Sequence, residues 1–544
     1  MRRAVFWRAA FFSPADFFSW IAFLALLAAA APCPAQVTYE RIRNAEKEPQ
    51  NWLTYSGDYS GRRHSPLKQI DVTNAAKLRP AWIFQMDLSH KLETSPVVVN
   101  GVMYITEPPS NVTALDARTG RPYWRYRRTL PQGLRYCCGQ VNRGVAVLGD
   151  RVFVGTMDAH LVALDAHSGL VRWDVEVESF AAGYSITAAP LVVKDRVIIG
   201  VSGGELGILG FIDAYDAATG RRVWRRYTIP GNGMPEQKTW AGESWGRGSA
   251  APWMTGSYDP ALNLIYWGSG NPGPNWNGDE RAGDNLFSNC LLAIDADTSG
   301  FRWHFQFTPH DVWAWDAAQV PVLVDAPFKG KPRKLIVTPN RNGFYYVLDR
   351  ASGEFLLAVP FVKQTWAERI DEKGRPVVKP DAIPSTAGAK VYPSPEGATN
   401  WYSPAFSPIT GLLYAAVREA GAVMYKAPAL FRPGSLFAGG SWRPVPGEEA
   451  RGAVRALQLE DGRMKWEFPL QTQPWAGLLS TAGGLVFGGT EEGHFFALDA
   501  ASGKVLWRFP AGGRITANPV TYMVDGRQHV TIASGQALVA FALE

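Results

Sequence analysis

The chain has 544 residues, of which 46% are hydrophobic and only 19% charged, and these proportions exclude a disordered or polyelectrolyte protein. The formal net charge of +6 is mild, and no Lys/Arg-rich stripe with interleaved aromatic residues is present, so nucleic acid is not an expected partner. The 54 Gly and 39 Pro residues indicate many turns, as in a protein built of short strands.

The first segment in chain order predicts export. Three arginines precede an apolar run over residues 21–31, and a stretch of small residues follows it. This order of a basic, an apolar and a small-residue region is typical of a secretory signal peptide. We therefore expect residues 1–35 to be removed on export to the periplasm, leaving residues 36–544 as one mature domain without a membrane span. A membrane anchor is the alternative for the apolar run.

The strongest organisational signal is a repeated segment in which an apolar residue and Asp precede Ser/Thr-Gly, and Trp follows four residues after the Gly. Such regular self-similarity is the signature of repeat architectures. The complete or nearly complete copies end in Trp124, Trp173, Trp224, Trp303, Trp466 and Trp507, and a further copy has Leu357 in place of Trp.

Each copy predicts a β-hairpin. The Asp and Ser/Thr side chains can hydrogen-bond within the turn, Gly supplies a positive φ, and the Trp falls in the outgoing strand, where it can pack against a neighbouring sheet. Most copies are spaced by roughly forty to fifty residues, which is the period of a four-stranded propeller blade. We predict an all-β, eight-bladed β-propeller that begins near Trp82, with inserted loops at 225–250 and 360–400 and a degenerate unit near 411–415. A β-sandwich array or a β-solenoid is the alternative.

The cysteines include one unusual pair. Cys137 and Cys138 are adjacent, and consecutive Cα atoms lie about 3.8 Å apart, whereas ordinary disulfides prefer about 4.4–6.8 Å. A bond between such neighbours would present a flat, rigid surface, and two free or separately paired thiols are the alternative. Cys290 lies in an apolar run and is expected to be a buried thiol.

The Trp-bearing repeats and the stretch Cys137–Arg143 together resemble the pyrroloquinoline quinone-dependent alcohol dehydrogenases, typified by the large subunit of methanol dehydrogenase. The likeness covers nearly all of the mature chain. It implies an eight-bladed propeller that holds the quinone between a vicinal disulfide, here Cys137–Cys138, and an indole, here Trp253. It also implies a metal ion that grips the oxygens of the quinone.

The resemblance carries the family's site residues onto this chain. Arg341 matches the basic residue beside the reactive carbonyl of the quinone. Its planar guanidinium group can stabilise negative charge that develops on the carbonyl oxygen. The implied metal ligands, Glu205, Asn271 and Asp316, offer the oxygens that calcium and lanthanide ions prefer. The implied quinone-binding residues are Glu93, Cys137, Cys138, Arg143, Thr187, Ser202, Gly203, Gly204, Trp253, Arg341, Asn400 and Trp475.

One stretch departs from the family's pattern. The family's catalytic stretch reads approximately T-P-H-D-x-W-D-[YW]-[AD], whereas residues 308–316 of this chain place Ala314 at the position of the usual base. Asp316 follows two residues later, where lanthanide-dependent members resemble this chain by placing an additional Asp ligand. Because residues two apart share one face of a strand, we expect Asp316 to approach the same site as both base and metal ligand.

The resemblance implies a periplasmic dehydrogenase that takes a proton from a primary alcohol and transfers hydride to the quinone, with assistance from the metal. No C-x-x-C-H haem motif is present, so a separate cytochrome c is the expected electron acceptor. Two alternatives stay open: a non-catalytic or weakly active scaffold, which Ala314 favours, and a quinoprotein that acts on sugars or aldehydes. The particular alcohol, the choice between calcium and a lanthanide, and a monomer or a homodimer also stay open.

Overall fold

Strands make up almost all of the regular structure in residues 37–87 and 91–544, which are the residues that the computed structural model describes. The expected signal peptide over residues 1–35 lies outside them. The α-helix within them is short (α2, Tyr39–Arg43), and none of their helices is long and apolar enough to cross a membrane. The 3-10 turns are η1 (Ala45–Lys47), η2 (Ala75–Lys77), η3 (Phe180–Ala182), η4 (Gly204–Leu206), η5 (Pro235–Thr239), η6 (Ser244–Arg247) and η7 (Pro380–Ala382).

The strands of the described residues form eight sheets of four or five strands, and two smaller sheets. In five of the eight, four consecutive strands pair antiparallel in sequence order, as in a meander of successive hairpins. These sheets consist of β3 (Val97–Val99), β4 (Val102–Glu107), β5 (Asn111–Asp116) and β6 (Pro122–Tyr126); β7 (Ala146–Leu148), β8 (Arg151–Gly155), β9 (His160–Asp165) and β10 (Val171–Glu176); β11 (Leu191–Val193), β12 (Arg196–Gly200), β13 (Phe211–Asp216) and β14 (Arg222–Tyr227); β15 (Ser257–Asp259), β16 (Leu264–Gly268), β17 (Cys290–Asp295) and β18 (Phe301–Gln306); and β19 (Val322–Phe328), β20 (Lys331–Pro339), β21 (Phe344–Asp349) and β22 (Phe355–Pro360).

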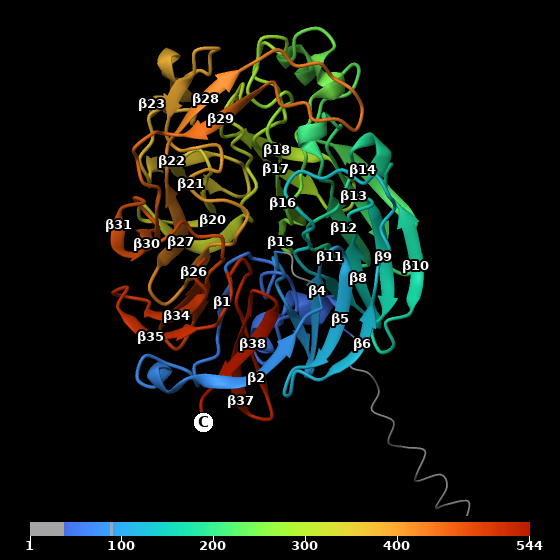
Figure 1. The fold of residues 1–544 in the computed structure, drawn as a ribbon, viewed down its shortest axis with the longest axis vertical. Coiled ribbons are helices and arrows are strands. Elements are labelled where there is room, and N and C mark those ends of the chain that lie inside the picture. The colour runs from blue at the N-terminus through green and yellow to red at the C-terminus, as the bar shows by residue number, and fades with distance from the viewer. Residues whose placement is uncertain (1–36, 88–90) are drawn as a thin grey trace, which may run out of the picture. The chain divides into compact units, whose positions relative to one another are not determined.

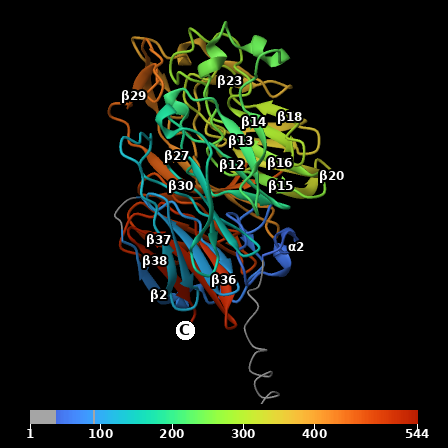
Figure 2. The same ribbon diagram turned by 90° about the vertical axis from the view of Figure 1, so that its right-hand side faces the viewer.

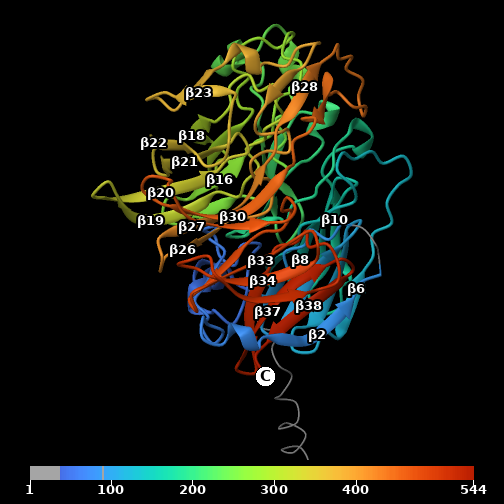
Figure 3. The same ribbon diagram turned by 60° about the vertical axis from the view of Figure 1, so that its left-hand side comes forward.

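The other three large sheets are less regular in sequence order. The last of them joins the two ends of the described chain, because β2 pairs with β38, and Figures 1 and 2 both show β2 alongside the C-terminal strands. Figure 3 shows these three sheets one after another. They consist of β26 (Ala405–Ser407), β27 (Leu412–Glu419), β30 (Arg451–Gln458) and β31 (Met464–Leu470); β1 (His64–Ser65), β32 (Leu479–Thr481), β33 (Leu485–Gly489), β34 (His494–Asp499) and β35 (Val505–Pro510); and β2 (Arg79–Gln85), β38 (Ala537–Ala542), β37 (Arg527–Ser534) and β36 (Val520–Val524).

The two smaller sheets interrupt this succession. β23 (Ala367–Ile370) pairs with β24 (Pro376–Val378), and β25 (Ala389–Val391) pairs with β28 (Ala422–Lys426), which pairs with β29 (Gly440–Pro444). The expected insertion at 360–400 is therefore partly strand rather than loop. The expected insertion at 225–250 contains the 3-10 turns η5 and η6.

The Trp of each repeat joins one sheet to the next. Trp124 of β6 donates its indole N–H to the carbonyl oxygen of Ala166, in the β9–β10 turn of the following sheet, at 2.9 Å. The same bond recurs between successive sheets and returns from the last sheet to the first. The donor–acceptor pairs are Trp82–Ala117, Trp124–Ala166, Trp173–Ala217, Trp224–Ala296, Trp303–Arg350, Trp466–Ala500 and Trp507–Leu78.

The copy that lacks Trp uses a different donor for the same connection. Leu357 lies in β22, and Tyr345 of the same sheet donates its hydroxyl to the carbonyl oxygen of Leu459 in the next sheet at 3.2 Å. The succession of sheet-to-sheet contacts therefore has no break, which is the arrangement of a β-propeller.

In most copies of the repeat the Gly is needed because the Trp of the preceding sheet lies directly over it. Gly169 has φ +71°, and a Cβ atom on it would approach Trp124 to 2.5 Å. We expect Gly169→Ala to lower the free energy of unfolding by about 1–3 kcal/mol more than Gly526→Ala does, because overpacking adds to the cost of the left-handed backbone. Gly526 is a matched control, since its φ is +73° and a Cβ atom on it would meet no other atom within 4 Å. Urea unfolding measures both variants, and equal losses would contradict this account of the repeat.

Candidate functional site

One cavity of about 390 Å³ brings together side chains from most of the sheets. Every residue that the sequence analysis assigned to the quinone or the metal lines it. These residues are Glu93, Cys137, Cys138, Arg143, Thr187, Ser202, Gly203, Gly204, Glu205, Trp253, Asn271, Asp316, Arg341, Asn400 and Trp475.

These residues meet because of where they lie in each sheet. Trp253 precedes the first strand of its sheet, β15, and Asn271 lies between the second and third strands, β16 and β17. In an antiparallel meander these two kinds of loop emerge at the same end of the sheet. The repeat turns join the third strand to the fourth and so lie at the other end. Residues far apart in the sequence can therefore face one cavity while the repeat turns lie away from it.

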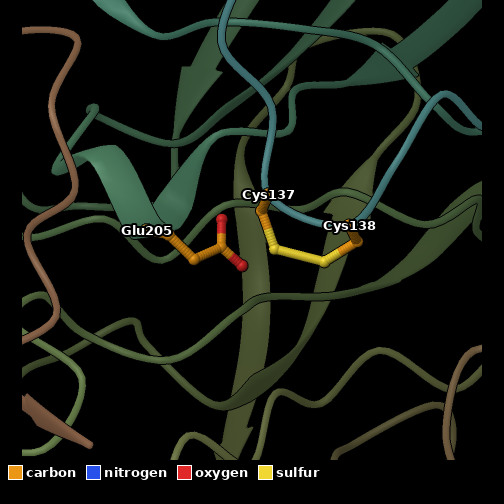
Figure 4. A group of neighbouring side chains, drawn as sticks. All are labelled: Cys137, Cys138 and Glu205. Atoms are coloured by element: carbon orange, nitrogen blue, oxygen red, sulfur yellow. A yellow bond between two sulfur atoms is a disulfide. The ribbon is translucent and has the colours of Figure 1, made fainter.

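A vicinal disulfide lies on the wall of the cavity. Cys137 and Cys138 are bonded to each other, with their Cα atoms 3.8 Å apart, so the alternative of free thiols is wrong. Figure 4 shows the Glu205 carboxylate pointing toward this disulfide, and one of its oxygens lies within 4.8 Å of both sulfur atoms. Disulfide sulfurs are not thiolates, so they are not expected to serve as metal ligands. Cys290 is buried, as expected.

Asp316 is held by three donors from three segments. Its Oδ1 accepts the backbone N–H of Asn271 at 2.6 Å. Its Oδ2 accepts the indole N–H of Trp253 at 3.1 Å and the guanidinium of Arg341 at 2.7 Å. The Asp316 carboxylate is therefore fixed beside the flat Trp253 indole and beside Asn271, another candidate metal ligand.

Glu205 adds a second carboxylate to this part of the cavity. Burial raises the pKa of Glu205, the negative charge of Asp316 raises it further, and Arg341 acts in the opposite direction. Two neighbouring carboxylates in a buried site are stabilised by a cation. The side-chain N–H of Asn271 donates to Pro272 O at 3.0 Å. The amide oxygen of Asn271 is left to serve as a further ligand for such a cation.

A second group of connected polar side chains lies on the cavity wall. Glu93 and Arg143 form a buried ion pair at 2.6 Å, and burial raises the pKa of Glu93 while Arg143 opposes that rise. Arg143 also donates to Thr187 Oγ1 at 2.8 Å, and the Thr187 and Ser202 hydroxyls lie 2.9 Å apart. These contacts fix four of the expected quinone-binding residues relative to one another.

The stretch over residues 308–316, which the resemblance matched to the family's catalytic segment, is not a strand, so that part of the sequence-based expectation is wrong. Residues 308–318 form a loop between β18 and β19, and Ala314 has φ +63° within it. Ala314 and Asp316 nevertheless both line the cavity. Strand alternation is therefore not the reason that they share a site; the path of this loop is.

The sequence analysis missed several residues of the cavity wall. Trp401 directly follows Asn400, and Trp276 lies five residues after Asn271 in the same loop, so proximity to assigned residues was an available signal for both. Trp442 comes from β29 of an inserted sheet, for which no motif gave a signal. The missed residues include Lys91, Arg135, Tyr136, Trp276, Glu396, Trp401 and Trp442.

Comparison with known proteins agrees with this geometry. The family model described as glucose/ethanol/alcohol dehydrogenase, beta-propeller domain, matches residues 52–370 and 460–530. The quinoprotein alcohol dehydrogenase PedH of Pseudomonas putida is 40% identical, and the match covers 94% of this chain and 90% of that protein.

Two solved structures are similar over almost the whole chain. A quinohemoprotein alcohol dehydrogenase from Comamonas testosteroni has a TM-score of 0.90 and 34% identity, with 95% of this chain and 84% of that one covered. A europium-containing methanol dehydrogenase has a TM-score of 0.89 and 33% identity, with 93% of this chain and 100% of that one covered. The family model, the relatives and the cavity lead to one conclusion: the chain belongs to the pyrroloquinoline quinone-dependent alcohol dehydrogenases, a family of oxidoreductases with a β-propeller fold.

Proposed function

We propose that this protein oxidises a primary alcohol in the periplasm, using pyrroloquinoline quinone and a metal ion in the cavity, and passes the electrons to a separate cytochrome c. The observation that carries the proposal is the convergence, in one cavity, of a flat disulfide and indole with two carboxylates and an amide. The relatives named above are quinoproteins and quinohemoproteins, which supports the same chemistry.

The residues present fit a planar, anionic quinone. The Cys137–Cys138 disulfide and the Trp253 indole offer flat surfaces on the cavity wall, and aromatic faces bind planar groups by stacking. Arg143 and Arg341 offer guanidinium groups, which bind carboxylates and carbonyl oxygens with fixed geometry. The residues that we propose to bind the quinone are those that the sequence analysis assigned to it.

The residues present also fit a hard cation. The cavity wall carries as many basic side chains (Lys91, Arg135, Arg143, Arg341) as acidic ones (Glu93, Glu205, Asp316, Glu396), so its formal charge is balanced. A quinone that carries carboxylates adds negative charge, and a metal ion at Glu205, Asn271 and Asp316 would offset it. Carboxylate and amide oxygens suit calcium and lanthanide ions, and the europium-containing relative supports a lanthanide ion.

The proposed chemistry divides between the cofactor and the chain. When bound, the quinone supplies the electrophilic carbon that accepts hydride from the alcohol. Asp316 accepts the hydroxyl proton at its carboxylate, since it is the acidic group held beside the Trp253 indole. Arg341 places a positive charge against Asp316 and restrains its orientation.

The second candidate is a protein that binds the quinone but turns over weakly or not at all. Ala314 favours it, because the cavity wall carries a methyl group at the position where a carboxylate would be the usual base. The two candidates differ in one respect only, which is whether Asp316 can perform the proton transfer.

We propose further that the eight large sheets are the eight blades of the propeller and that residues 36–544 form one domain after removal of a signal peptide over residues 1–35. The compact unit from Val37 to Glu544 and the unbroken sheet-to-sheet contacts support this organisation. A homodimer is compatible with the proposal but is not required by it.

The test is dye-linked oxidation of primary alcohols by purified protein reconstituted with the quinone and either calcium or a light lanthanide. We expect turnover of about 1 s⁻¹ or faster with one of the metals and none after chelation, since typical enzymes turn over at about 1–10³ s⁻¹. A quinone absorption spectrum without turnover on any alcohol would favour the second candidate, and failure to bind the quinone would contradict both.

A further inference from the structure

The loops that carry Asn271 and Asp316 are joined by a buried arginine behind the cavity wall. Arg281 is fully buried and does not itself line the cavity. Its guanidinium donates to Pro274 O at 2.9 Å, in the β16–β17 loop, which also carries Asn271 and Arg281 itself. The same nitrogen donates to Asp311 O at 2.6 Å, in the loop that leads to Asp316. A single side chain therefore connects the two ligand-bearing loops.

The Asp311 side chain shapes the second of these loops. Its Oδ1 accepts the backbone N–H of Trp313 at 2.9 Å, and its Oδ2 accepts that of Trp315 at 3.0 Å. These two N–H groups lie on either side of Ala314, whose φ of +63° costs an alanine roughly 1–2 kcal/mol. The Asp311 carboxylate thus holds the backbone in the conformation that brings Asp316 to the cavity.

Further contacts hold the same loop from behind. Asn289 donates its amide to Asp311 Oδ2 at 3.2 Å and to Trp315 O at 2.6 Å. The Trp313 and Trp315 rings stack at 5.1 Å, and each lies within 5.3 Å of the Trp366 ring, which belongs to the insertion. Contacts from Asn289 and Trp366 therefore hold the loop in addition to those of Asp311.

Two buried charged groups are a costly way to join two loops. Burial lowers the pKa of Arg281 to about 10, and it raises the pKa of Asp311 to about 6. Apolar side chains of similar volume often give equal or greater stability at such positions.

We propose that Arg281 and Asp311 act as a clamp that fixes the separation between Asn271 and Asp316, and with it the size of the metal site. The clamp rests on the proposed function, because it presupposes that these two residues bind the ion. Arg281 and Asp311 are positioning residues: neither lines the cavity, and both act through the backbone of the loops that carry the ligands.

The test is a titration of the purified protein with terbium(III) alone, followed by sensitised luminescence. We expect Arg281→Met and Asp311→Asn each to raise the terbium dissociation constant by about 10–100-fold, the usual loss when a supporting partner of a ligand is removed. Luminescence lifetimes in H₂O and D₂O should also report more bound water than in the wild type, because a wider site admits more water. Asp311→Asn keeps the shape of the side chain and covers the case in which Arg281→Met does not fold.

Arg350→Met is the matched control. Arg350 is also buried, and it donates to Asp259 Oδ2 at 2.7 Å and to Val324 O at 3.3 Å, away from the cavity. We expect this variant to melt at a lower temperature but to bind terbium with the wild-type constant and lifetime. Clamp variants that melt early yet bind terbium as the wild type does would overturn the clamp alone. Wild-type protein that binds no terbium would overturn the proposed metal site, and the clamp with it.

Discussion

Replacing Asp316 with alanine is expected to lower kcat/KM for alcohol oxidation by about 10³-fold or more. The change removes the proposed proton acceptor, and general-base catalysis contributes about 10²–10⁴-fold. It also removes one of the two carboxylates of the proposed metal site and leaves Arg341 and the Trp253 indole without their shared acceptor. The dye-linked assay measures the loss, with quinone occupancy read from the absorption spectrum of the same sample.

Asp316→Asn separates chemistry from geometry in this experiment. The amide oxygen can still accept a hydrogen bond from Trp253 or Arg341, but it is a poor proton acceptor. We expect this variant to retain bound quinone and to lose turnover nearly as completely as Asp316→Ala. Activity within about tenfold of the wild type in either variant would mean that another group takes the proton.

Replacing Glu205 with alanine is expected to weaken metal binding by more than about 100-fold and to abolish metal-dependent turnover. Loss of a group that merely supports a ligand already costs about 10–100-fold in affinity, and Glu205 is proposed as a ligand itself. Terbium luminescence measures the affinity. Glu205→Gln, which keeps one oxygen donor, should give an intermediate loss.

In the absence of metal, Glu205→Ala should not lower the free energy of unfolding. The pKa of Glu205 is raised in the folded protein, so its charged form is favoured less there than in the unfolded chain. A carboxyl whose pKa is raised by folding destabilises the folded state increasingly as the pH rises from its pKa in the unfolded chain to its pKa in the folded protein. Replacing Glu205 with alanine removes this destabilisation at neutral pH. A lower melting temperature of metal-free Glu205→Ala would therefore contradict the view that this carboxylate is retained for a cation.

The repeats of the fold could be predicted because the signal for them is local. In most copies the Trp follows the Gly of the turn by four residues, and the structure uses both residue types in one contact, as Trp124 does when it covers Gly169 and donates to Ala166. The missing Trp at Leu357 could be located, but its replacement by the Tyr345 hydroxyl could not, because that contact joins residues of two sheets far apart in the sequence.

The site could be predicted only through the family resemblance. Periodicity does not reveal that loops before β3, β7 and β15 face the same cavity as the loop after β12. The error at residues 308–316 has a physical cause: a strand was assumed in order to bring Ala314 and Asp316 to one face, but the Asp311 carboxylate binds two backbone N–H groups and holds a loop instead. Arg281 was not predicted because its partners are backbone carbonyls, which leave no pattern in the sequence.

The most direct test of the proposed activity is an anaerobic single-turnover experiment on wild-type protein loaded with quinone and metal. The protein is mixed with a primary alcohol without any electron acceptor, and both the quinone absorption and the aldehyde formed are measured. We predict that the spectrum of the oxidised quinone is lost and that one aldehyde is formed for each quinone bound. Bound quinone whose spectrum does not change, with no aldehyde formed, would contradict the account and leave a quinone-binding propeller without this activity.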